Sequence, residues 1–195
     1  AREQAHLAAD DIAAWNQLGC LSPHAFYVQR GGAHGAEKFA ELLAEALAEK
    51  ESTEPRGELT TADAANIADL RSLYETRAAN VGDVRLWQSE ESTAWTVIYD
   101  REQVFRPSCL NRFVFVKEVE DLEEALRTAE MIRGQVSTVG LAATKLDAAD
   151  LVRQLAHWGV TRVCPIGQMQ NPPITWRHDG RPALADYVRW TDWEL

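Results

Sequence analysis

Apolar side chains recur every three or four residues in three segments of the first half of the chain. Residues 3–18 carry polar side chains such as Asp11 on the opposite face, which predicts a half-buried helix that ends at Gly19. The apolar face of this helix is expected to hold Ala5, Ala8, Ile12 and Trp15. Two further helices are predicted over 36–50, which is rich in Ala, Leu and Glu, and over 61–79, which a threonine can cap.

Short runs of β-branched and aromatic residues predict strands. They are expected over 25–29, 84–88, 95–99, 113–116, 137–141 and 161–164. A short polar link joins 84–88 to 95–99, which favours an antiparallel pair. Helices near 120–132 and 146–157 alternate with the later strands, a pattern typical of a parallel sheet, and a final short helix is expected around 182–190. The predicted class is α/β, with a largely parallel sheet and an added antiparallel pair.

Composition and charge narrow the class of protein. The chain has 195 residues, of which 46% are hydrophobic, so a single domain over 1–195 is expected. Its net charge of -10 and its lack of a run of Lys or Arg make nucleic acid an unexpected partner. No apolar stretch reaches the roughly twenty residues that a membrane span needs. A soluble, cytoplasmic protein is therefore predicted.

Three cysteines lie far apart in the sequence, at Cys20, Cys109 and Cys164. Their odd number argues against a disulfide framework and favours reduced thiols. No C-x-x-C spacing occurs and the histidines form no ligand pair with one another or with a cysteine, so no metal site is predicted.

Cys20 follows Gly19 at the predicted change from helix to extended chain. A thiol displayed at such a junction can act as a nucleophile, while the backbone N–H groups from Gly19 to Leu21 can face an incoming carbonyl oxygen. Considered alone, an isolated cysteine is more often an inert buried residue, and burial is the expectation for Cys109 and Cys164. The sequence pattern by itself leaves both interpretations of Cys20 open.

Three separated segments supply a specific resemblance. They are 17–23 (QLGCLSP), 108–116 (SCLNRFVFV) and 167–180 (GQMQNPPITWRHDG). Together they resemble the bioluminescence-type (Lux) long-chain fatty acyl-CoA reductases, a distant branch of the aldehyde dehydrogenase superfamily. The resemblance covers nearly all of the chain and corresponds to the family's C-terminal catalytic half. It implies a three-layer α/β/α catalytic domain whose nucleotide-binding half lies outside this sequence, and no G-x-G-x-x-G pattern is present.

The resemblance also implies roles for single residues. Cys20 matches the family's acyl-accepting cysteine, which takes the acyl group from acyl-CoA or an acyl-protein, and hydride from NADPH then releases a fatty aldehyde. His24 and His178 are candidate acid or base residues, and Arg112 is a candidate contact to a cofactor or CoA phosphate. Aldehyde-oxidising relatives carry a cofactor-binding glutamate where this chain has 108–112, so the contact to the cofactor ribose is open. A homo-oligomer is also possible within the superfamily.

Other interpretations remain at this stage. The chain could belong to an aldehyde dehydrogenase-like oxidoreductase that runs in the opposite direction, or it could be a non-catalytic module that accepts an acyl group or binds a partner. His178 could instead satisfy its own turn. Trp15, Trp87 and Trp158 could line an acyl tunnel, although core packing explains them equally well.

Overall fold

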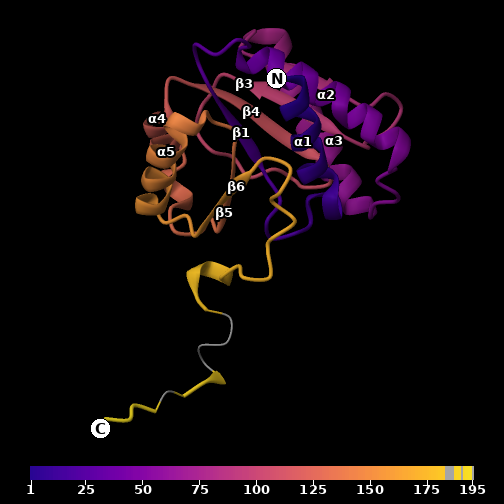
Figure 1. Ribbon diagram of the computed structural model, residues 1–195. Coiled ribbons are helices and arrows are strands. Elements are labelled where there is room, and N and C mark those ends of the chain that lie inside the picture. Colours follow the sequence, from indigo (N-terminus) through magenta and orange to yellow (C-terminus); the bar gives the residue numbers. More distant parts are fainter. Residues whose placement is uncertain (183–186, 190, 195) are drawn as a thin grey trace.

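A four-stranded sheet with helices on both faces forms the larger part of the computed structural model, which describes residues 1–182, 187–189 and 191–194 (Figure 1). The strand order is β1-β4-β3-β2. Its strands are β1 (Ala25–Gln29), β2 (Val84–Gln88), β3 (Thr96–Asp100) and β4 (Phe113–Val119). β1 and β3 each pair in parallel with β4, and β2 is antiparallel to β3. The predicted class, including the antiparallel pair, is confirmed.

Alternating side chains of the central strands divide the core into two clusters. Val97 and Val114 pack with α1 (Arg2–Ala13) and α2 (Ala36–Thr53) on one face of the sheet. Ile98 and Phe115 pack with α3 (Thr61–Asn80) on the other face. Because neighbouring residues of a strand point to opposite faces, these two clusters define a three-layer α/β/α arrangement. The threonine cap expected for α3 is Thr60, whose hydroxyl accepts the Asp63 N–H.

The last two strands form a sheet of their own. β5 (Thr138–Leu141) and β6 (Arg162–Pro165) pair in parallel with each other, and no pairing with the four-stranded sheet occurs within the described residues. α4 (Leu122–Thr128), a 3-10 turn (Glu130–Ile132) and α5 (Lys145–Trp158) accompany them, around a third apolar cluster that includes Leu155 and Trp158. The alternation of strands and helices is as predicted, but it builds a second small sheet instead of extending the first.

The first helix ends earlier than its apolar spacing predicts. α1 stops at Ala13, and a 3-10 turn (Ala14–Gln17) follows in which Trp15 and Asn16 have left-handed backbone. Trp15 is consequently 74% exposed and does not join the apolar face with Ile12. Asp11, predicted on the polar face, is buried instead. The final helix expected around 182–190 falls largely on residues outside those described, namely 183–186 and 190.

Candidate active site

Cys20 lies in a tight turn between α1 and β1. The Ser22 N–H donates to the Gly19 carbonyl at 3.0 Å and closes this turn. Cys20 is exposed, whereas Cys109 and Cys164 are partly buried, and burial raises the pKa of both of those thiols, that of Cys109 to about 11. Cys20 is thus the one exposed thiol of the three, which is the property that a nucleophilic cysteine requires.

A left-handed turn precedes the cysteine and ties its segment to the sheet. Trp15, Asn16 and Gln17 have φ angles of 54°, 51° and 63°. The Gln17 side chain is 1% exposed, and its Nε2 donates to the Pro23 carbonyl at 2.7 Å and to the Phe113 carbonyl at 3.0 Å. This single amide therefore connects both ends of the segment 17–23 to the start of β4.

A second left-handed turn packs against the first. It consists of Leu110, Asn111 and Arg112, with φ angles of 65°, 56° and 64°, and it directly precedes β4. The Asn111 N–H donates to the Asn16 carbonyl at 3.0 Å, so the backbones of the two turns are joined. The turn lies within the segment 108–112, for which the sequence left the contact to a cofactor ribose open. In this chain the same segment braces the cysteine loop.

Arg112 lies inside the domain, contrary to the outward orientation that a phosphate contact would need. Its side chain is 3% exposed, and its Nε donates to Asn16 Oδ1 at 3.0 Å. Its Nη1 pairs with Glu51 Oε2 at 2.8 Å, and its Nη2 donates to the Glu54 carbonyl at 3.0 Å. Burial lowers the pKa of this guanidinium, yet an arginine stays charged. These contacts correct the expectation of a cofactor contact and give Arg112 a structural connection to the cysteine loop.

The third motif reaches the cysteine turn through Gln170. Its Nε2 donates to Ser22 Oγ at 2.7 Å, and a Cβ built on Gly19 would lie 3.0 Å from its Oε1, so a larger residue at position 19 would require the Gln170 amide to shift. Asp11 anchors this segment by accepting the N–H groups of Gly167 at 2.6 Å and Met169 at 2.9 Å. The sequence pattern gave neither residue a role at the site, since it placed Asp11 on the polar face of the first helix and Gln170 lies unmarked inside the quoted motif.

His24 is held by Ser108 at the entrance to β1. The Ser108 N–H donates to His24 Nδ1 at 3.2 Å, and Ser108 Oγ lies 3.0 Å from the same nitrogen. A backbone amide can only donate, so Nδ1 offers its lone pair and the neutral ring carries its proton on Nε2. This arrangement supports a hydrogen-bond donor at Nε2 and not a general base.

Protonation of His24 should lower the stability of the fold. Burial lowers the pKa of the imidazole below its ordinary 6.5. Between the two pKa values the unfolded state binds more protons, so the free energy of unfolding should fall as the pH drops through 6.5 and below. The free energy of unfolding, measured by denaturant titration at each pH, should depend less steeply on pH in His24→Gln than in the unaltered protein. Equal slopes would contradict the assignment.

His178 lies apart from the cysteine turn. Its ring packs against Trp176 in a tilted arrangement with centroids 4.8 Å apart, and its Nδ1 lies 3.0 Å from Asp179 Oδ2. Both partners of the His178 and Asp179 pair are largely exposed. Within the described residues no hydrogen bond or ion pair connects His178 to Gly19, Cys20 or Leu21.

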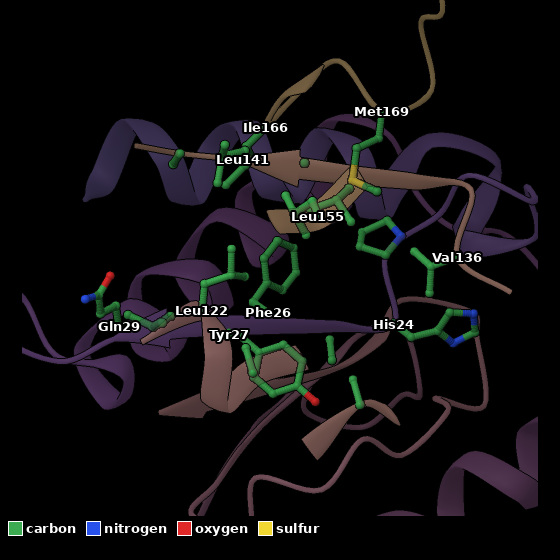
Figure 2. Close-up of a pocket in the computed structure, with 18 of the residues that line it drawn as sticks. His24, Phe26, Tyr27, Gln29, Leu122, Val136, Leu141, Leu155, Ile166 and Met169 are labelled. Carbon is green, nitrogen blue, oxygen red and sulfur yellow. The ribbon is translucent and has the colours of Figure 1, made fainter. Parts of the chain in front are cut away.

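A cavity of about 530 Å³ begins beside the cysteine turn (Figure 2). All five residues of β1 line it, and so do all four of β5, which places the cavity along the facing edges of the two strands. His24 and Gln29 lie at its opposite ends in Figure 2. Apolar side chains form most of the wall, including Phe26, Leu141, Leu155 and Met169, and Trp158 also contributes. The residues Ser22 and Pro23 connect the cavity to the segment that carries Cys20.

Comparison with known proteins identifies the family. A family model described as acyl-CoA reductase (LuxC) matches residues 1–190. The chain belongs to the LuxC acyl-CoA reductase family. The resemblance carried by the three motifs is thereby confirmed, and the structure shows that these motifs meet around Cys20. A comparison with curated protein sequences finds no match for this LuxC-family chain.

A solved structure supports the fold of this LuxC-family chain. The bifunctional proline utilization A (PutA) protein superposes with a TM-score of 0.61 at 16% sequence identity. The aligned region covers 88% of this chain and 18% of that protein, so the chain spans less than a fifth of its length. At this identity the likeness concerns the fold alone.

The loop from Gly31 to Gly35 connects β1 to α2, but Arg30 beside it is paired with Glu118 and Glu120, and the Glu118 carboxylate lies 3.8 Å from a Cβ built on Gly35. This acidic surrounding does not fit a nucleotide phosphate. In the part of the LuxC-family chain that the structure describes, no cluster of His, Cys, Asp or Glu is arranged to hold a metal, and no helix is long and apolar enough to cross a membrane.

Proposed function

We propose that this chain is the catalytic part of a long-chain acyl-CoA reductase, in which Cys20 accepts the acyl group as a thioester. The observation that carries the proposal is the exposed Cys20 thiol in a turn braced by all three family motifs. The match to the acyl-CoA reductase family supports an acyl thioester as the substrate class.

The proposed transfer exchanges one thioester for another. The Cys20 thiolate attacks the carbonyl carbon of the acyl-CoA, a new C–S bond forms, and the bond to the CoA sulfur breaks. The CoA leaves as a thiolate that takes up the proton released from Cys20. Within the described residues no hydrogen bond uses the backbone N–H groups of Gly19, Cys20 or Leu21, so these donors are free for the oxyanion that forms during attack.

The reduction step needs a hydride donor, for which we propose NADPH. When bound, it would supply a hydride to the acyl carbon, after which the bond to the Cys20 sulfur would break and release a fatty aldehyde and the Cys20 thiolate. The acidic surroundings of the loop from Gly31 to Gly35 argue against a nucleotide at that loop. In this proposal the chain's own residues present the thiol and hold the acyl group.

The apolar cavity beside the turn supports a long acyl chain as the substrate. Its volume of about 530 Å³ falls within the roughly 300–1,000 Å³ of small-molecule sites, and its wall is mostly apolar. Aldehyde oxidation is the second candidate, because the family belongs to the aldehyde dehydrogenase superfamily. The two functions differ in whether CoA is released from acyl-CoA.

Acyl labelling of the unaltered protein tests the proposal. The complete protein that contains this chain is incubated with isotopically labelled tetradecanoyl-CoA without NADPH, and peptides are located by mass spectrometry. We expect one acyl group on Cys20, none on Cys109 or Cys164, and one equivalent of free CoA. Addition of NADPH should clear the label and yield tetradecanal. Absence of label on Cys20 would overturn the acyl-thioester mechanism, and a persistent label with NADPH present would identify an acyl-accepting module instead.

A further inference from the structure

Arg112 connects three distant parts of the chain at the base of the cysteine loop. Its guanidinium contacts the turn before Cys20 through Asn16, the end of α2 through Glu51 and Glu54, and it belongs to the turn before β4. A planar guanidinium has fixed donor directions, so hydrogen bonds to three different partners fix the position and orientation of the Arg112 side chain. Asn16 is held on its other side as well, because its Nδ2 donates to the Arg56 carbonyl at 3.0 Å.

The turn that Arg112 holds is conformationally costly. Left-handed backbone is unfavourable for residues other than glycine and persists only where the surroundings determine it. Core packing cannot fix the left-handed backbone at Trp15, because the side chain of Trp15 is 74% exposed. The contacts that Asn16 accepts from Arg112 and from the Asn111 N–H therefore hold the turn in place together with the two hydrogen bonds that Gln17 donates.

We infer that Arg112, acting through Asn16, is a positioning residue that sets the turn of Cys20 for attack on the thioester carbonyl. The inference rests on the proposed function. Cys20 follows Asn16 by four residues, so a shift of the left-handed turn moves the thiol relative to the bound substrate. A misplacement of about 1 Å between reacting groups can lower a rate about a hundredfold. Arg112 itself touches neither the thiol nor the substrate.

The test compares two reactions of the same thiol. In the complete protein, Arg112→Met should lower the rate constant for acylation of Cys20 by tetradecanoyl-CoA by about tenfold to a hundredfold. Alkylation of Cys20 by iodoacetamide needs no bound substrate, so its rate should change by no more than about twofold. Both rates are followed by intact-protein mass spectrometry at a temperature below the unfolding of every variant.

Arg71 offers a matched control for a merely structural effect. It is also buried, and its guanidinium donates to Thr96, Ser92, Ser89 and Trp95, but none of its hydrogen bonds reaches either left-handed turn. Arg71→Met should therefore lower the melting temperature while leaving the acylation rate constant within about twofold. Arg112→Lys keeps the positive charge but lacks the several N–H donors of the planar guanidinium, so it should give an intermediate acylation rate.

A second variant separates the contact from the backbone conformation. Asn16→Gly adopts left-handed backbone readily but removes the amide that Arg112 binds, so acylation should fall as it does in Arg112→Met. Acylation of both variants at the unaltered rate would overturn the inference, as would an equal loss in Arg71→Met or a parallel loss of alkylation. These outcomes leave the proposed function standing, which fails only if Cys20 of the unaltered protein is never acylated.

Discussion

Replacement of Cys20 by serine is expected to remove acyl labelling and to lower acyl-CoA reduction by the complete protein at least about a thousandfold. The serine hydroxyl is close in size but far less nucleophilic than a thiolate at neutral pH, so the turn would remain while the acyl acceptor is lost. Because Cys20 is exposed, the melting temperature should not change. Release of CoA and formation of aldehyde are the two measurements.

The other two cysteines provide the matched controls for this variant. Cys109 and Cys164 are partly buried, and burial raises the pKa of each thiol, so neither is expected to take the acyl group. Cys109→Ser and Cys164→Ser should keep both labelling and reduction, with any loss confined to stability. Reduction by Cys20→Ser at the unaltered rate would exclude the acyl-cysteine mechanism.

Replacement of Asp100 by alanine is expected to destabilise the domain by about 3–5 kcal/mol. Asp100 and Lys117 are completely buried, with Lys117 Nζ 3.7 Å from Asp100 Oδ2. Arg77 binds the same carboxylate with both of its terminal nitrogens, at 3.1 and 3.2 Å. Loss of the carboxylate would leave the Lys117 ammonium buried without its anion, and burial already lowers the pKa of Lys117. Denaturant unfolding monitored by circular dichroism measures the change.

Asp83 is the control for this effect, because it pairs with the same arginine at a more exposed position. Its carboxylate lies 3.3 Å from Arg77 Nη2, and its side chain is 31% exposed. Asp83→Ala should therefore cost no more than about 1 kcal/mol. A similar small change for Asp100→Ala would show that the buried cluster around β3 and β4 does not depend on its central carboxylate.

Local sequence patterns predicted the helices and strands well where buried residues recur at a regular spacing. The apolar spacing of 61–79 and the threonine before it predicted α3 and its cap, and the β-branched runs predicted all six strands within a few residues. Periodicity failed at Trp15, where the next apolar position was assigned to a helix that had already ended. A period describes only the average environment of a face and carries no information on where the backbone leaves the helix.

The environments of the polar residues of the site could not be predicted from local sequence patterns. Asp11 was predicted to face solvent, but it accepts hydrogen bonds from Gly167 and Met169, more than 150 residues away in the sequence. Arg112 was expected to face a cofactor, yet its partners are Asn16, Glu51 and Glu54. A carboxylate or guanidinium is stable on a surface or in a buried network, and only its distant partners decide between the two.

The sequence by itself determined the α/β class, the position of Cys20 between the first helix and the first strand, and the family, since all three depend on local patterns and motifs. The tertiary structure alone decided that the three motifs meet at one turn, that β5 and β6 form a separate sheet, and that Arg112 supports the cysteine loop from inside. The meeting of the motifs and the position of Arg112 depend on contacts between segments about 60 to 160 residues apart, and β5 pairs with β6 across an intervening helix. Such contacts form when buried polar groups must find partners, and no local pattern specifies which partner that will be.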